Sequence, residues 1–341
     1  MANQTGDRGF NTVRNSSVAK RERNRAMQKY TILGVIALAT LAVAVLLVMA
    51  VGGIVANIRE ASGKAPSSEK VEWSSITVTA TDTLQGPLVL VNNTHVYTFP
   101  ANDDHLSEIY AVFVSHTPRK YAQSGLSTYM ETEALKALDT MLVDFYNLTG
   151  KDNVQIRYAY RSLEDQAEFS VAPGYSDHHT GYGVQLKYQH NGNAYAFSTD
   201  PEGSYNWFFE NCHKYGFVIR YPENKSDLTG DTQKYTDYFR YVGVAHATYM
   251  KANDLCMEEY VDLLKGYTAE KPLKITGADS RYYETWYVAV DGSATVKYPT
   301  NYAYTISGTN DGGVVVTVDR TKTASPETET TEETTAVIPV G

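Results

Sequence analysis

The chain has 341 residues, of which 43% are hydrophobic and 20% are charged, and its net charge is −9. This balance favours a globular body with added segments. It excludes a small scaffold held by disulfides, because Cys212 and Cys256 are the only cysteines. The acidic charge also argues against a nucleic-acid partner, since phosphates attract basic surfaces. Whether the two cysteines pair is open at this level.

The first 58 residues predict a membrane anchor. Residues 1–29 form a basic tail, and residues 30–58 contain no charged side chain. A run of about 20 apolar residues is long enough to cross a bilayer. A cleaved signal peptide normally has a shorter apolar region, so a retained transmembrane helix is favoured. Because the basic cluster precedes the span, we expect a single-pass plasma-membrane protein with a cytoplasmic N-terminus and an extracellular C-terminal domain.

The next segments predict a stalk and then a mixed domain. Residues 59–85 are assigned to the stalk, although the alternation SSITVTAT within them is typical of a strand. Residues 86–267 combine helical and strand patterns. The expected elements are a helix over 127–149 that stops at Gly150, a strand over 153–160, a helix capped by Gly216 before the strand FVIRYP, and one broken or two short helices over 244–265.

The composition changes after this domain. Residues 268–320 contain runs such as ETWYVAV and GVVVTV, separated by turn sequences such as DG and NDGG. This pattern predicts a small β appendage of about four strands. Residues 321–341 are rich in Thr and Glu and are expected to be disordered.

One polar segment, PGYSDHHTGYGVQL at 173–186, is a candidate functional site. Ser176, His178 and His179 lie within four residues, which is compatible with a metal or acid–base site. Taken alone, the same residues also fit a polar turn with hydrogen-bonded histidines, so the segment needs support from the rest of the chain.

That support is a resemblance to zinc D-alanyl-D-alanine carboxypeptidases of the VanY type. Ser176, His178 and Gly181 match the family motif Ser-x-His-x-x-Gly-x-Ala-x-Asp, with Gly183 in place of the Ala. Further similar segments follow the family's order: YRSLEDQ (160–166), ENCHKYGFVIRYPENKSDLTG (210–230) and FRYVGVAHATYM (239–250). The resemblance covers about 86–267, and the β-rich end is similar to an appendage of some Gram-positive members. It implies an α+β metallopeptidase fold with a central antiparallel sheet and flanking helices.

The resemblance also implies a zinc site. Two His and one Asp would hold the ion, a Glu would activate a water, and an Arg would pair with the carboxylate of a peptide ending in D-Ala-D-Ala. This chain keeps His178 and the Arg, which is Arg161. Gln166 and Ser176 also stand at family positions, so the substrate-binding part of the pattern is retained.

Most of the catalytic part is replaced. The Asp position holds Gln185, the second His position holds Tyr238, and the Glu position holds Tyr235. Gln offers a neutral amide, and a phenol with a pKa of about 10 must lose a proton before it ligates well. We therefore expect little zinc affinity, and loss of the Glu would slow any residual hydrolysis by roughly 10²–10⁴. His179, next to His178, and Asp237, next to Tyr238, are not expected to serve as replacement metal ligands, because adjacent strand residues face opposite sides.

These observations predict a cell-surface pseudoenzyme without a metal cofactor. It would bind peptidoglycan stem peptides, or regulate cell-wall enzymes, through Arg161, Gln166 and Ser176. Two alternatives stay open: an active zinc D,D-carboxypeptidase with altered ligands, and a purely structural surface protein.

Overall fold

The computed structural model describes residues 70–125, 129–230 and 237–323. All of these residues belong to one compact unit. Within them, no helix is both long and apolar enough to cross a membrane. The basic tail, the predicted span at 30–58 and residues 324–341 of the predicted disordered tail lie outside the described residues, as does Tyr235. Residues 321–323 of that tail are described, and they form the end of the last strand, Gly313–Thr323, rather than a disordered segment.

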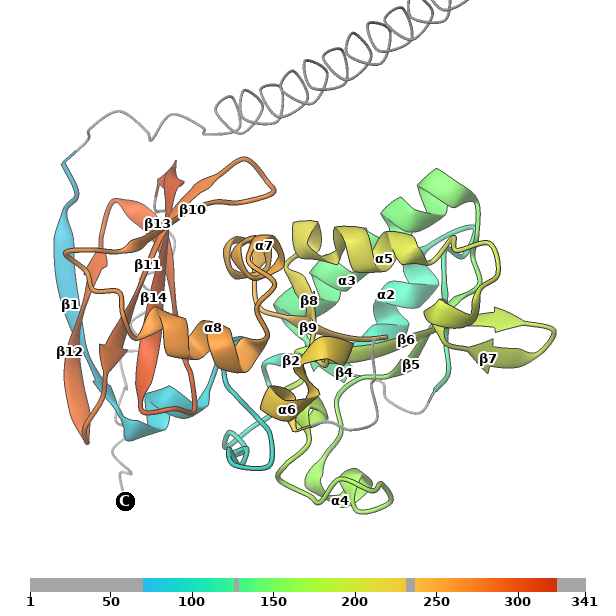
Figure 1. Cartoon of the computed structure of the whole chain (residues 1–341), viewed down its shortest axis with the longest axis horizontal. Helices are drawn as coiled ribbons and strands as arrows, with labels where there is room; N and C mark the ends of the chain where they lie inside the picture. Colours follow the sequence, from blue (N-terminus) through green and yellow to red (C-terminus); the bar gives the residue numbers. More distant parts are fainter. Residues whose placement is uncertain (1–69, 126–128, 231–236, 324–341) are drawn as a thin grey trace, which may run out of the picture. The chain divides into compact units, whose positions relative to one another are not determined.

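A mostly antiparallel sheet forms the centre of the described core (Figure 1). Its strand order is β3-β5-β6-β9-β8, with β7 beside β6, and only β3 and β5 pair in parallel. The bounds are β3 Ala122–Gln123, β5 Val154–Tyr158, β6 Gly183–His190, β7 Asn193–Tyr195, β8 Phe217–Ile219 and β9 Tyr238–Tyr241. The expected mixture of sheet and helices is confirmed, and the parallel β3–β5 pair is the departure from the antiparallel sheet that was predicted.

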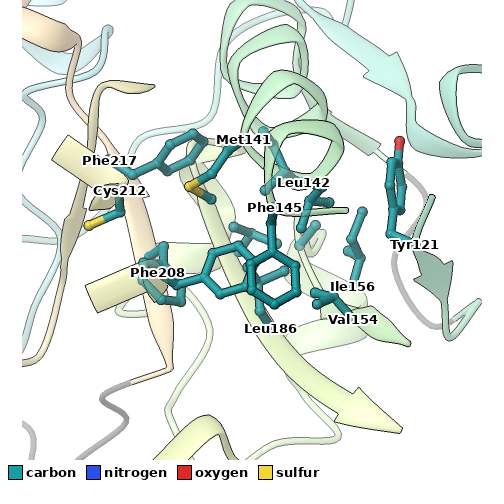
Figure 2. Packing of buried hydrophobic residues seen from close by; sticks show 14 of the residues in the cluster. Tyr121, Met141, Leu142, Phe145, Val154, Ile156, Leu186, Phe208, Cys212 and Phe217 are labelled. Carbon is teal, nitrogen blue, oxygen red and sulfur yellow. The ribbon is translucent and has the colours of Figure 1, made fainter. Parts of the chain in front are cut away.

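Helix α3, Thr132–Thr149, covers one face of this sheet. Its apolar residues recur every three or four positions, so one stripe is buried: Ala134, Leu135, Leu138, Met141, Leu142 and Phe145. This stripe packs on Val154, Ile156 and Leu186 of the sheet (Figure 2). The helix ends at Gly150, which is left-handed at φ 71° and donates its N–H to the Tyr146 carbonyl, as the sequence predicted.

The remaining helices are short. They are α2 Ile109–Ser115, α4 Leu163–Gln166, α5 Asn206–Asn211, α6 Ser226–Thr229, α7 Val244–Ala252 and α8 Met257–Leu264. The 3-10 turns are η1 Ala80–Leu84, η2 Asp177–Thr180, η3 Phe197–Thr199, η4 Cys212–Tyr215 and η5 Glu223–Lys225, and strands β2 Leu106–Glu108 and β4 Tyr129–Glu131 pair with each other. Residues 244–265 thus form two helices, and Gly216 ends η4 at φ 83°. Cys212 and Cys256 are separate buried thiols.

The C-terminal strands form a second group. They are β10 Leu273–Thr276, β11 Tyr282–Ala289, β12 Ser293–Pro299, β13 Tyr302–Gly308 and β14 Gly313–Thr323. Four of them form a sheet in the order β10-β11-β14-β13, whereas β12 pairs with β1, Trp73–Thr79. We call β1 and β10–β14 the β module.

Strand β1 corrects the expected stalk over 59–85. Residues 73–79 pair in register with β12, so Ile76 lies opposite Val296. Val78 is buried in one apolar cluster with Trp286 and Val296. The alternating pattern of SSITVTAT therefore reflects a strand of the β module.

The β module shares an apolar cluster with the core. Leu88, Leu90, Val261 and Ile275 belong to this cluster, together with other residues of α7 and α8. His246 of α7 adds a buried polar link: Nδ1 lies 2.8 Å from the Tyr260 hydroxyl and Nε2 lies 2.9 Å from Thr317 Oγ1 of β14. Burial lowers the pKa of His246 to about 4, so this link is neutral at physiological pH.

The role of β1 can be tested with one neighbouring pair of residues. Val78→Asp places an unpaired charge in the β-module cluster and should lower the free energy of unfolding by about 3 kcal/mol or more. Thr77→Asp changes an exposed position of the same strand and should alter it by less than about 0.5 kcal/mol. Urea denaturation measures both values. Equal effects of the two substitutions would show that this segment is not packed.

Candidate functional site

A cavity of about 440 Å³ is lined in part by residues of the central sheet. Strand alternation separates the two faces of β6: Val184 and Leu186 enter the apolar core, whereas Gln185 lines the cavity. The cavity brings together all of the predicted site residues that the structure describes: Arg161, Gln166, Ser176, His178, Gln185 and Tyr238.

The 3-10 turn η2 positions the histidines. Gly181 ends it at φ 71°, and a Cβ there would lie 3.2 Å from the Glu131 backbone nitrogen, so glycine is required on both grounds. His178 Nδ1 lies 2.5 Å from the Ala159 carbonyl oxygen. His179 Nδ1 contacts the Arg161 carbonyl oxygen at 2.8 Å, and its Nε2 accepts from the Gly174 N–H at 3.0 Å. His178 and His179 were expected on a strand, where they would face opposite sides. They lie in a 3-10 turn instead, and their rings again have different hydrogen-bond partners.

Arg161 forms one wall of the cavity. Its Nη1 donates to Gln166 Oε1 at 3.1 Å, and Gln166 Nε2 donates to the Val171 carbonyl at 2.8 Å. The guanidinium carbon also lies 3.6 Å from the centre of the Phe169 ring. A cation held by a side-chain amide and an aromatic ring keeps one orientation, which prepares it to receive an anion.

Asp177 is the residue of the site that the sequence reasoning missed. Its side chain is 2% exposed, and its Oδ1 accepts from Arg240 Nη1 at 2.5 Å and from Arg220 Nε at 3.2 Å. Its Oδ2 accepts from the Tyr238 hydroxyl at 3.1 Å. Burial alone would raise the pKa of Asp177, but Arg240 and Arg220 hold it below its usual value, so the carboxylate is ionised.

A sequence signal for this carboxylate did exist. Arg220 and Arg240 interrupt the apolar runs FVIRYP and FRYV, and both are fully buried. Buried arginines require acidic partners. Arg220 also pairs with Glu258 of α8 at 2.7 Å, so the arginines and the acids balance in charge.

The residues at the metal positions that the resemblance implies do not fit a zinc ion. The Tyr238 hydroxyl donates to Asp177, and burial, followed by that carboxylate, raises the pKa of Tyr238 well above its usual value, so the phenolate that would ligate zinc is disfavoured. Gln185 supplies a neutral amide whose Nε2 donates to Asp237 Oδ1 at 3.4 Å. Asp237 itself pairs with Lys187. Across the described ranges, no cluster of three or more His, Cys, Asp or Glu side chains could hold a metal ion.

Gly183 and Tyr238 are structurally coupled. A Cβ added at Gly183 would overlap the Tyr238 hydroxyl and lie 3.0 Å from Asp177 Oδ2. The Ala of the motif that the sequence resembles therefore could not coexist with Tyr238 in this position. The two departures from the motif therefore fit each other sterically.

Comparisons with known proteins agree with the sequence resemblance. The family model described as VanY, D-alanyl-D-alanine carboxypeptidase, matches residues 155–244. A D-alanyl-D-alanine carboxypeptidase of Enterococcus faecium is 31% identical over 252 residues, which are 71% of this chain and 78% of that protein. The putative carboxypeptidase YodJ of Bacillus subtilis is 31% identical over 208 residues, covering 54% and 71%.

The crystal structure of the D,D-dipeptidase VanXYg with a D-Ala-D-Ala phosphinate analogue is similar in fold. Its TM-score is 0.62 at 25% identity, and the match covers 73% of this chain and 99% of that one.

The coupling of Gly183 and Tyr238 predicts a non-additive pair of substitutions. Gly183→Ala should lower the free energy of unfolding by about 1–3 kcal/mol, because the methyl group overpacks the tyrosine. In a Tyr238→His background the same change should cost at least about 1 kcal/mol less. Urea unfolding of the four variants measures this. Gly266→Ala, where the nearest atom to the added Cβ is 3.4 Å away, controls for the glycine replacement itself, and an equal cost in both backgrounds would contradict the coupling.

The buried carboxylate predicts a large and pH-dependent effect. Asp177→Asn leaves Arg220 and Arg240 without their shared anion and should cost about 3–5 kcal/mol at pH 7. Because the pKa of Asp177 is lowered on folding, its contribution is present above the unfolded pKa of about 3.9 and is lost as the pH falls below it. The gap between the two proteins should therefore narrow below about pH 4.

Thermal or urea unfolding from pH 7 to pH 3 measures that gap. Asp144→Asn is the matched control, because Asp144 accepts from the Tyr215 hydroxyl at 2.8 Å on the surface, and it should cost less than about 1 kcal/mol. A gap that does not depend on pH would contradict the assignment of the stabilising charge to Asp177.

Proposed function

Because this chain belongs to the VanY family of D-alanyl-D-alanine carboxypeptidases, we propose that it binds the D-alanyl ends of peptidoglycan stem peptides without hydrolysing them. One observation carries the proposal: the cavity keeps one part of the family's site and lacks another. Arg161, the expected carboxylate-binding arginine, is present and held by a hydrogen bond, whereas the expected metal positions hold Gln185 and Tyr238.

The retained half supports binding. The Arg161 guanidinium can pair with a terminal carboxylate in a charge-assisted hydrogen bond, which is stronger than a neutral one. Ser176 and Gln166 lie beside it and offer further polar contacts. A cavity of about 440 Å³ lies within the range of about 300–1,000 Å³ that small ligands occupy, so the end of a peptide fits.

The replaced half argues against hydrolysis. A metal would polarise the scissile carbonyl and lower the pKa of a bound water, and the neutral amide of Gln185 and the protonated phenol of Tyr238 give it little hold. Burial, followed by Arg161, lowers the pKa of His178 to about 3, so this imidazole stays neutral. The sequence also places Tyr235 where relatives are expected to carry the general base.

The proposed location is the outer face of the plasma membrane. The uncharged residues 30–58 would span the bilayer, and the basic tail before them would stay in the cytoplasm. The cavity would then face the cell wall, where stem peptides are found. The protein would compete with wall enzymes for the D-alanyl ends of these peptides, or would regulate those enzymes. No nucleic-acid partner is proposed.

The test combines binding, turnover and metal content. Purified full-length protein in detergent should bind a muropeptide ending in D-Ala-D-Ala by calorimetry, release no D-alanine and contain no stoichiometric zinc. Arg161→Ala should weaken binding at least about tenfold, because a hydrogen bond to a charged group is lost. Arg119→Ala, an exposed arginine next to Phe113, should leave binding unchanged.

Two other results would replace the proposal. Stoichiometric zinc together with D-alanine release that a chelator stops would identify an active enzyme with altered ligands. Absence of binding, with no effect of Arg161→Ala, would leave a structural surface protein.

A further inference from the structure

The three side chains at the metal positions that the resemblance implies share one chemical property: each can offer a lone pair to a ligand in the cavity. The first is His178. Its Nδ1 faces the Ala159 carbonyl oxygen at 2.5 Å, and a carbonyl can only accept, so Nδ1 carries the proton. In the neutral ring Nε2 is then an acceptor, and the ring lines the cavity.

Gln185 and Tyr238 are oriented in the same sense. Gln185 donates from its Nε2 to Asp237 Oδ1 at 3.4 Å, and its amide oxygen can accept a hydrogen bond from a ligand. The Tyr238 hydroxyl gives its only proton to Asp177 Oδ2 at 3.1 Å, so its oxygen can accept one more hydrogen bond. A hydroxyl that donates to a carboxylate is also polarised into a better acceptor.

The three acceptors lie close together. Gln185 and Tyr238 are opposite each other in the β6–β9 ladder. The His178 and Tyr238 rings meet edge to face with their centres 4.7 Å apart. Each side chain is less than 10% exposed, so the group that they contact must be withdrawn from water and must recover its hydrogen bonds from them.

We propose that these three acceptors, His178 Nε2, Gln185 Oε1 and Tyr238 Oη, bind a primary ammonium group of the ligand at the place where relatives are expected to hold their metal. A primary ammonium has three N–H donors and one positive charge, so it matches three converging acceptors in number and in sign.

Arg161 sets the remaining requirement on the ligand. A second cation in this cavity would be repelled by the guanidinium unless an anion lies between them. The ligand must therefore carry both a carboxylate, which pairs with Arg161, and an ammonium, which reaches the three acceptors. This inference rests on the proposed function and adds a preference to it: among ligands with a D-alanyl carboxylate end, a short zwitterionic peptide with a free amine binds more tightly than an end whose amines are all acylated.

The experiment compares two ligands that differ only in this group. Full-length protein in detergent, with a chelator present, is titrated with D-Ala-D-Ala and with N-acetyl-D-Ala-D-Ala. The free dipeptide should bind at least about tenfold more tightly, because only it brings a charged donor to the acceptors. Its advantage should disappear as the pH rises above the amine pKa of about 8.

One substitution assigns the effect to the acceptors. Tyr238→Phe should weaken binding of the free dipeptide about tenfold and that of the acetylated one by much less, because the acetylated nitrogen carries no charge. Tyr121→Phe is the matched control, because the Tyr121 hydroxyl is also buried and donates to an aspartate, Asp139, away from the cavity. The comparison of the two ligands on the unaltered protein stands even if Tyr238→Phe does not fold.

The outcomes separate the inference from the proposed function. Equal affinity for the two dipeptides overturns the ammonium site and leaves the binding of D-alanyl ends intact. If neither dipeptide binds, the ammonium site is also overturned, and the muropeptide titration decides the proposed function independently. A preference for the free dipeptide that vanishes in Tyr238→Phe, but not in Tyr121→Phe, supports the inference.

Discussion

The carboxylate of Asp177 is the group on which the rest of the site depends. It is buried, ionised and shared between Arg220 and Arg240. Both arginines also donate hydrogen bonds to backbone carbonyls. Arg240 Nη2 donates to the carbonyls of Pro87 and Val89 at 3.1 Å each, and Arg220 Nη2 donates to the Val91 carbonyl at 3.2 Å. One acidic side chain thus fixes the turn that carries His178 to strands β8 and β9 and to the segment 87–91. Removing either the carboxylate or the arginines would leave a buried charge without a partner, so the three side chains depend on one another.

The same carboxylate accounts for the packing of Tyr238. Compared with the histidine that the resemblance implies at this position, a tyrosine brings a larger ring and a hydroxyl into a buried place. Both have a defined destination, since the hydroxyl bonds to Asp177 and the space near it is free because position 183 is glycine. A polar group buried in this way costs little, because its hydrogen bond is made.

Much of the local structure could be predicted from the sequence, because it depends on neighbouring residues. The stripe of α3 and its end at Gly150 follow from helical spacing and a glycine stop. The gathering of Arg161, Gln166, Ser176 and His178 around one cavity was expected from the family resemblance.

Contacts between distant segments could not be predicted in this way. No pattern in SSITVTAT names β12 as its partner more than 200 residues away. The importance of Asp177 was equally hidden, since in the sequence it is one acidic residue in a polar turn. Its two arginines lie directly after β8 and within β9, and only the fold reveals that these strands pair. The alternation of β1 could indicate a strand, but its place in the β module depends on Val78, Val296 and Trp286 meeting in three dimensions.

These contacts also change how the chain should be divided. Composition suggests a boundary near residue 268, but the segment 87–91 is held from both sides. Its odd-numbered carbonyls accept from the two arginines, while the Leu88 N–H donates to Ser307 Oγ at 3.0 Å and the Leu90 N–H to the Thr309 carbonyl at 2.9 Å. The buried bond between His246 and Thr317 joins α7 to β14 in addition. Since the arginines that hold Asp177 also hold this segment, the β module belongs to the support of the cavity, and a core cut at 267 would lose part of what fixes Tyr238 and His178.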